Sequence, residues 1–208
     1  MVQVKICGLT NKEAIETAVE AGADFIGFVF ARSKRQLTIK AASELADSVP
    51  SHVKKVGVFV NESLKTIQEI SDKVGLDYVQ LHGDESPAFC REIEMPVIKA
   101  FQVTSRADLE QIVLYDCAYY LLDSPAGKYR GGNGETFDWA MTKDHDFLDK
   151  KIILAGGLHS DNIAEAIKEV SPIGVDVSSG VETEGKKDVN KIKTFIQAAK
   201  KGDENGNL

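Results

Sequence analysis

The stretch VKICGLTNKEAIETAVEAGADFIGFVF, residues 4–30, contains the unit from which we predict the fold. A short apolar run around Val4 is followed by a segment, 11–21, in which apolar residues recur with helical spacing. A second apolar run begins near Phe25. This order is typical of a β-strand, an amphipathic helix and a second strand. The stretch therefore predicts a strand–helix–strand unit.

The same unit recurs along the whole chain. Apolar runs begin near Val4, Phe25, Val56, Tyr78, Val97, Tyr119, Ile152 and Gly174. Helical periodicity is clearest in the segments 11–21, 63–74, 161–170 and 188–199. Strands that are apolar enough to be buried on both faces indicate a parallel sheet. Eight such units close most economically into a (β/α)8 barrel, so we predict this α/β fold.

An open doubly wound sheet is the alternative fold. It usually has a GxGxxG turn after its first strand, and the sequence Cys7-Gly8-Leu9-Thr10 is not such a turn. Polar residues before three of the helical segments are candidate N-caps, because their side-chain oxygens can accept bonds from free backbone N–H groups. These residues are Thr10 or Asn11, Asn61 and Ser160.

The size and charge of the chain limit its class. With 208 residues it is close to the lower size limit of this barrel, so we predict one domain over residues 1–201. The polar, glycine-rich residues 202–208 are expected to form a disordered tail. The net charge of −7 argues against a nucleic-acid partner and against binding to an anionic membrane surface. It does not exclude a small anionic substrate.

Cysteine usage and the apolar runs indicate the compartment. Cys7, Cys90 and Cys117 are an odd number of cysteines without a CxxC motif, so neither a disulfide framework nor a zinc site is expected. The N-terminus has no long apolar region, and no apolar run is long enough to span a membrane. We therefore expect a cytoplasmic protein without a metal and without contact with a membrane.

Active sites of these barrels lie at the carboxyl ends of the strands. The seventh strand leads into LAGGL and the eighth into DVSSGVE. Backbone N–H groups in such turns can hold a phosphate, and a phosphate site after strands 7 and 8 recurs in this fold. We expect the phosphate-binding turns to include Gly156, Gly157, Ser178, Ser179 and Gly180.

Two residues that can transfer protons end the first and sixth strands. Cys7 and Asp123 would lie three strands apart on a circle of eight and face each other across the mouth of the barrel. From the residues alone, Cys7 is either a packed core cysteine or a reactive thiol. Asp123 is either a general acid or a turn residue before Pro125.

Further polar residues follow other strand ends. His82 either lines the site or is a hydrogen-bonded structural histidine. Asp176 either binds a sugar hydroxyl or satisfies buried groups. The glycine-rich loop 124–136 is long for this fold, and it is either a lid or a flexible linker.

Six motifs resemble the phosphoribosylanthranilate isomerase family, and the resemblance covers residues 3 to about 200. The motifs are KICGLT at 5–10, QLHGDE at 80–85, LLDS at 121–124, GGNGETFDW at 131–139, LAGGL at 154–158 and DVSSGVE at 176–182. The resemblance implies a (β/α)8 barrel that isomerises N-(5-phosphoribosyl)anthranilate to 1-(2-carboxyphenylamino)-1-deoxyribulose 5-phosphate in tryptophan biosynthesis. It implies no cofactor and no metal.

The resemblance also implies roles for individual residues. Cys7 corresponds to the general base, Asp123 to the general acid, and Arg35 to the arginine that holds the anthranilate carboxylate. The family often has proline before that arginine, where this chain has Lys34, so Arg32 remains a second candidate. The usual GGTG loop reads GGNG here, with Asn133, which tolerates the same turn.

The residue types suit an Amadori rearrangement. Opening the ribose ring needs a proton, which Asp123 can give near neutral pH only if burial raises its pKa. The resulting Schiff base then loses its C2′ proton to a base. The Cys7 thiol becomes a useful base if a nearby cation or helix N-terminus lowers its pKa.

Three other functions remain as alternatives. A histidine-pathway aldose isomerase would have an acidic residue in place of Cys7. An indole-glycerol phosphate synthase would have a lysine acid and additional N-terminal helices. A catalytically inactive barrel that binds a phosphorylated ligand would not need both Cys7 and Asp123. Either a monomer or a homodimer is compatible with the sequence.

Overall fold

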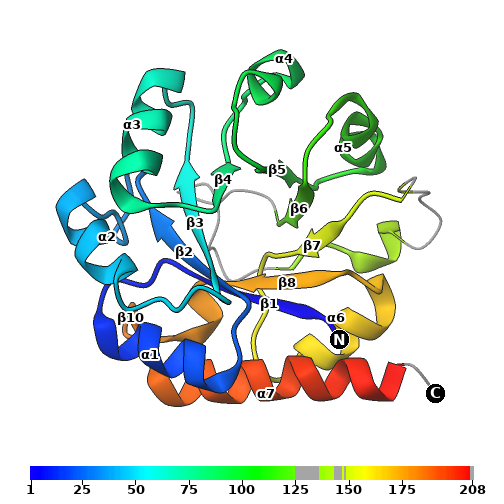
Figure 1. The fold of residues 1–208 in the computed structure, drawn as a ribbon. Coiled ribbons are helices and arrows are strands. Elements are labelled where there is room, and N and C mark those ends of the chain that lie inside the picture. The colour runs from blue at the N-terminus through cyan, green and yellow to red at the C-terminus, as the bar shows by residue number, and fades with distance from the viewer. Residues whose placement is uncertain (125–135, 143–146, 148, 207–208) are drawn as a thin grey trace.

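A closed barrel of eight parallel strands, paired in chain order, forms the centre of the protein (Figure 1). The computed structural model describes residues 1–124, 136–142, 147 and 149–206. Its strands are β1 (Gln3–Cys7), β2 (Phe25–Val29), β3 (Lys54–Phe59), β4 (Tyr78–Leu81), β5 (Val97–Gln102), β6 (Tyr119–Asp123), β7 (Ile152–Leu154) and β8 (Gly174–Val177). All eight begin within two residues of the predicted starts, and the (β/α)8 class is confirmed.

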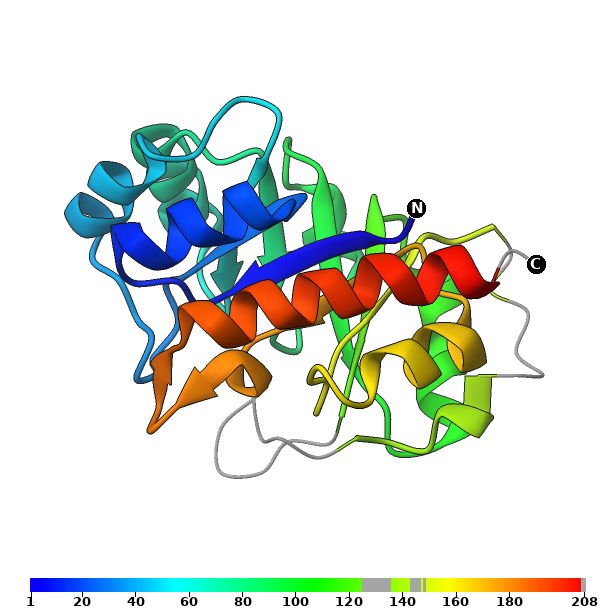
Figure 2. The ribbon, with the colours of Figure 1, turned by 90° about the horizontal axis from the view of Figure 1, so that it is seen from below.

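Helices surround the barrel on its outer side (Figure 1). The described α-helices are α1 (Lys12–Ala21), α2 (Ile39–Ala46), α3 (Leu64–Val74), α4 (Pro87–Arg91), α5 (Arg106–Glu110), α6 (Ile163–Val170) and α7 (Val189–Gly206). Short 3-10 helices are η1 (Gln111–Leu114), η2 (Trp139–Thr142) and η3 (Ser179–Val181). Helix α7 packs against α1 and α6 and runs beside β1, so the last helix closes the ring next to the first strand (Figure 2).

The caps of the helices agree only in part with the sequence analysis. Asn11 caps α1, and its side chain accepts a bond of 2.9 Å from the Ala14 N–H. The predictions for Asn61 and Ser160 are wrong, because α3 begins directly after Ser63 and α6 after Asn162. An N-cap must immediately precede the first helical residue. The Asn61 side chain instead accepts a bond from the backbone of the β4–α4 loop.

One end of the barrel interior is filled by aromatic rings. Phe25, Tyr78 and Tyr119 start alternate strands, and their ring centroids lie 5.7–5.8 Å apart in edge-to-face contact. Such pairs combine large apolar burial with favourable ring geometry. They close the amino ends of the strands, so the hollow that remains lies at the carboxyl ends.

A hairpin that the sequence analysis does not predict lies between β8 and α7. Its strands are β9 (Glu182–Thr183) and β10 (Lys186–Lys187), which pair antiparallel. Helix α7 then continues to Gly206, so the backbone of 202–206 is helical. Residues 207–208 lie outside the described part of the chain, and disorder of the tail 202–208 stays a prediction. No helix among the described residues is long and apolar enough to cross a membrane.

Candidate active site

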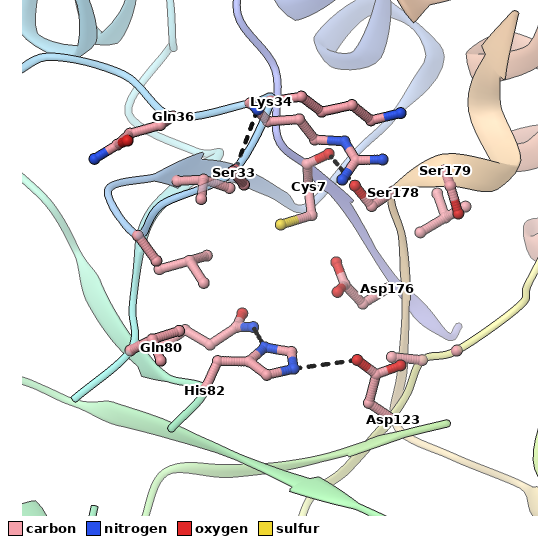
Figure 3. A pocket seen from close by; sticks show the side chains of 18 of the residues that line it. Cys7, Ser33, Lys34, Gln36, Gln80, His82, Asp123, Asp176, Ser178 and Ser179 are labelled. Carbon is pink, nitrogen blue, oxygen red and sulfur yellow. Dashed lines mark hydrogen bonds and ion pairs between the residues drawn. The ribbon is translucent and has the colours of Figure 1, made fainter. Parts of the chain in front are cut away.

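A pocket of about 780 Å³ opens at the carboxyl ends of the strands (Figure 3). It brings together every residue that the sequence analysis places in the site. These are Cys7, Arg35, His82, Asp123, Gly156, Gly157, Asp176, Ser178, Ser179 and Gly180, and the alternative Arg32 lines the pocket as well. Most of loop 124–136 lies outside the described residues, so a role as a lid stays a prediction.

Cys7 ends β1, and its sulfur points into the pocket (Figure 3). Only 7% of the residue is exposed. Burial raises the pKa of the thiol above its ordinary value, and the positive charges of Lys5 and Lys187 oppose this rise without cancelling it. Cations that lower the pKa of the thiol are therefore present beside it, but desolvation is the largest effect and the net shift of the pKa is upward.

Asp123 ends β6 and is also buried, with 3% of the residue exposed. Its Oδ2 lies 3.1 Å from His82 Nε2, and its Oδ1 accepts a bond of 2.9 Å from the Ser124 N–H. His82 Nδ1 lies 3.1 Å from the amide nitrogen of Gln80, which can only donate (Figure 3). A neutral His82 ring then carries its proton on Nε2 and donates it to Asp123. His82 thus both lines the pocket and orients the carboxyl group.

The turns after β7 and β8 meet at the other end of the pocket. Gly156 and Gly157 have φ values of 82° and 63°, a conformation that favours glycine. The turn after β8 leads into η3, and Gly180 lies against the carbonyl oxygen of Leu158, where a β-carbon would collide with it. Two loops in such close contact, with a short helix behind one of them, have the arrangement that phosphate sites of this fold typically show, and phosphate binding at these turns stays a prediction.

Gly180→Ala is expected to weaken phosphate binding. The added methyl group must push η3 away from Leu158, and overpacking of this kind costs roughly 1–3 kcal/mol. We expect KM for the substrate and the inhibition constant of inorganic phosphate to rise together. Gly22→Ala at the end of α1 is the control, since it has nothing within 4 Å of the added carbon and strains only the left-handed backbone there, with a φ of 98°. It should lower stability and leave phosphate affinity unchanged. Unchanged phosphate affinity in Gly180→Ala would place the phosphate elsewhere.

Arg35 reaches the pocket from the loop after β2 and is held by Glu182. Its Nε and Nη2 donate to the two carboxylate oxygens of Glu182 at 2.5 and 3.0 Å. Lys34 and Lys187 also contact Glu182, each at 3.2 Å. Although burial opposes it, Arg35 and Lys187 lower the pKa of Glu182 to about 2. Glu182 therefore stays ionised and fixes the guanidinium in one orientation.

Lys187 connects this charge cluster to the phosphate turns and to Cys7. Its Nζ donates to the Ser178 carbonyl at 2.7 Å, and Ser178 Oγ donates to the Cys7 carbonyl at 3.2 Å. Burial lowers the pKa of Lys187 to about 8, even though Glu182 favours the charged form. The hairpin β9–β10 thus supplies a buried cation beside the ends of β1 and β8.

Four residues of the site are not identified by the sequence analysis. Gln80, Glu182 and Lys187 hold the side chains described above, and Lys5 is hydrogen-bonded to Asp176. Lys5 has a recognisable signal, because a lysine inside a strand that is buried on both faces needs a paired anion. No group of three or more metal-ligating side chains occurs in the described ranges.

A protein-family model described as N-(5'phosphoribosyl)anthranilate (PRA) isomerase matches residues 4–198. An N-(5'-phosphoribosyl)anthranilate isomerase of Bacillus cereus is 54% identical over 198 residues, covering 95% of this chain and 98% of the relative. The enzyme of the same name from Oceanobacillus iheyensis is 52% identical over 201 residues, covering 96% and 98% of the two chains.

Solved structures agree with these relatives. Phosphoribosyl anthranilate isomerase from Thermotoga maritima superposes with a TM-score of 0.89 at 42% identity, covering 97% of this chain and 100% of that one. A complex of such an isomerase with reduced 1-(o-carboxyphenylamino)-1-deoxyribulose 5-phosphate has a TM-score of 0.86 at 40% identity, with the same coverage. Another Thermotoga maritima structure, with a TM-score of 0.87 at 41% identity and again the same coverage, is of monomers generated from a dimeric isomerase.

Proposed function

Since this chain belongs to the N-(5'-phosphoribosyl)anthranilate isomerase family, we propose that Cys7 and Asp123 carry out the proton transfers of its reaction. The reaction is the Amadori rearrangement of N-(5'-phosphoribosyl)anthranilate to 1-(2-carboxyphenylamino)-1-deoxyribulose 5-phosphate, a step of tryptophan biosynthesis. The observation that carries the proposal is that both residues line one pocket together with the two glycine turns.

Asp123 protonates the ring oxygen of the ribose and so opens the ring to a Schiff base. Its carboxyl group is buried and ends a strand that points at the pocket. The His82 N–H near Oδ2 stabilises the negative charge that remains after the proton has left. His82 therefore acts through Asp123 and fixes its orientation.

Cys7 removes the C2′ proton of the Schiff base, which gives an enolamine that rearranges to the ketone. The thiolate is the form that accepts this proton. Cys7 and Asp123 come from β1 and β6, so the acid and the base approach the ribose from different sides of the pocket (Figure 3). The sugar lies between them when the phosphate occupies the turns after β7 and β8.

The anthranilate carboxylate binds Arg35. Glu182 accepts hydrogen bonds from the Nε and Nη2 of the Arg35 guanidinium. The remaining N–H groups of this planar guanidinium can bind a second carboxylate. Arg32 lies in the same loop and lines the same pocket, so both residues must be tested.

Arg35→Ala is expected to raise KM about 10- to 100-fold with a smaller effect on kcat, because a hydrogen bond to a charged group contributes roughly 1.5–3 kcal/mol. Glu182 keeps Lys34 and Lys187 as partners in this variant, so no carboxylate is left unpaired. A substrate analogue without the carboxylate should bind both forms equally. If Arg32→Ala shows this pattern and Arg35→Ala does not, the assignment of the two arginines is reversed.

Complementation tests the proposed function as a whole. The gene should restore growth on minimal medium to a tryptophan auxotroph that lacks this isomerase, and a variant with both Cys7→Ser and Asp123→Asn should not. Absence of growth despite expression of soluble, folded protein would contradict the proposed activity.

We also propose that the protein is cytoplasmic. We propose the phosphorylated small-molecule substrate as its main binding partner. The net charge of −7 supports the absence of a nucleic-acid partner. For the assembly we propose either a monomer or a homodimer. Sedimentation of the purified chain decides between the two.

A further inference from the structure

Lys5 is a charged residue inside the barrel that the reaction described above does not use. It lies on β1 two residues before Cys7, so both side chains project from the same face of the strand. The Lys5 side chain is 0% exposed, and its Nζ lies 2.9 Å from Asp176 Oδ1. The two residues occupy paired positions on the neighbouring strands β1 and β8. Asp176 thus supplies one of the anions that a buried ammonium requires.

The ammonium group also lies beside the Cys7 thiol. Gly27 on β2 is paired with Cys7 in the sheet register. A β-carbon at Gly27 would lie 2.9 Å from Cys7 Sγ and 3.2 Å from Lys5 Nζ. The sulfur and the ammonium nitrogen therefore share the space that this glycine leaves open, and no side chain of β2 separates them.

Several charged or titratable groups surround the thiol. Those facing it are Lys5 from β1, Asp176 from β8 and Lys187 from β10, with His82 and Asp123 on the other side of the pocket. Burial and Asp176 raise the pKa of the thiol, and Lys5 is the strongest opposing group. Burial alone would lower the pKa of Lys5, but Asp176 and Cys7 outweigh it and raise that pKa, so the lysine stays charged.

We propose that Lys5 is a positioning residue that acts through Cys7, and that its buried ammonium is the counter-charge of the thiolate that removes the C2′ proton. This inference rests on the proposed role of Cys7 as the base. Without a counter-charge a buried thiol would keep its proton, because desolvation penalises the thiolate. The thiol proton leaves to solvent through the pocket, and Lys5 keeps its own proton throughout. Asp176 competes with the thiolate for the same ammonium.

The pH dependence of Cys7 alkylation tests this proposal without measuring turnover. Iodoacetamide reacts with the thiolate, so the midpoint of its rate against pH reports the pKa of the thiol. Peptide mass spectrometry separates Cys7 from Cys90 and Cys117. The variants are Lys5→Met, which removes the cation, and Asp176→Asn, which removes the competing anion with little change of shape.

The two variants should shift the midpoint in opposite directions. We expect Lys5→Met to move it upward by about 1–3 pH units, since an opposite charge at this range shifts a pKa by that amount. Asp176→Asn should move it downward. The matched control is Lys99→Met, because Lys99 is also buried and forms an ion pair of 3.1 Å with Glu85, but it lies on β5. This control should lose stability and leave the midpoint unchanged.

A midpoint that is unchanged in Lys5→Met, or that shifts in the same direction in both site variants, would overturn the proposal. Should Lys5→Met fail to fold because it leaves Asp176 unpaired, the double variant Lys5→Met/Asp176→Asn removes both charges of the pair. Its midpoint should lie above that of Asp176→Asn, and an equal or lower midpoint would overturn the proposal. A different measurement, kcat of Cys7→Ser, shows whether the proposed function itself fails. If Cys7→Ser retains its kcat, Cys7 is not the base, even where the alkylation midpoints shift as expected.

Discussion

Cys7→Ser is expected to lower kcat by at least about 10²- to 10⁴-fold, the usual contribution of a general acid or base. A serine has nearly the size of the cysteine and fills the same position at the end of β1. Its hydroxyl does not form an anion near neutral pH, so it cannot accept the C2′ proton. Substrate binding should persist, because the phosphate turns and Arg35 are unchanged. Steady-state kinetics and titration with a reduced product analogue measure the two effects separately.

Cys90→Ser is the matched control for this variant. Cys90 is a buried cysteine of α4 with 3% exposure, and it does not line the pocket. Its replacement should change the free energy of unfolding but leave kcat unchanged. If iodoacetamide modified Cys7 and full activity remained, the thiol would serve only in packing.

Asp123→Asn is the second variant with a large expected effect. The amide keeps the shape of the carboxyl group but has no acidic proton for the ring oxygen, so we expect kcat to fall by at least about 10²- to 10⁴-fold. The bond to His82 Nε2 can be kept through the amide oxygen. The folded structure and the affinity for the product analogue should therefore be retained.

A carboxylate at the opposite end of the barrel provides the control. Asp24 accepts bonds of 2.8 Å from the Val4 N–H and from Lys200 Nζ, and it precedes β2. Asp24→Asn should lower stability without changing kcat. If both aspartate variants lost activity to the same extent, the loss would reflect general damage to the fold and not the absence of an acid.

Much of the fold could be predicted because it depends on local patterns. A strand that is buried on both faces is a short apolar run, and a helix on the outside of a barrel has one apolar stripe. Tyr78, Val97, Tyr119, Ile152 and Gly174 begin strands as predicted. The residues of the site could be predicted for two reasons. The carboxyl ends of the strands meet at one face of the barrel, and the family motifs identify individual positions at those ends.

The pairs that hold the site could not be predicted from local patterns. Arg35 and Glu182 are 147 residues apart and meet because the hairpin β9–β10, which begins at Glu182, lies beside the loop after β2. Neither loop has a periodic pattern that would indicate its course. Lys5 and Asp176 could have been paired, because a closed barrel places β1 beside β8. Lys5 lies between apolar residues of β1, and this apolar pattern conceals a charge that burial requires to be neutralised.

A substrate isotope effect tests the division of labour between Cys7 and Asp123 most directly. The measurement compares kcat for substrate with protium or deuterium at C2′ in both variants. In Cys7→Ser, removal of this proton becomes the slow step, so deuterium should slow the reaction clearly. In Asp123→Asn, ring opening becomes the slow step, so both substrates should react at the same rate. A clear isotope effect in Asp123→Asn together with none in Cys7→Ser would contradict the assignment of the base and the acid.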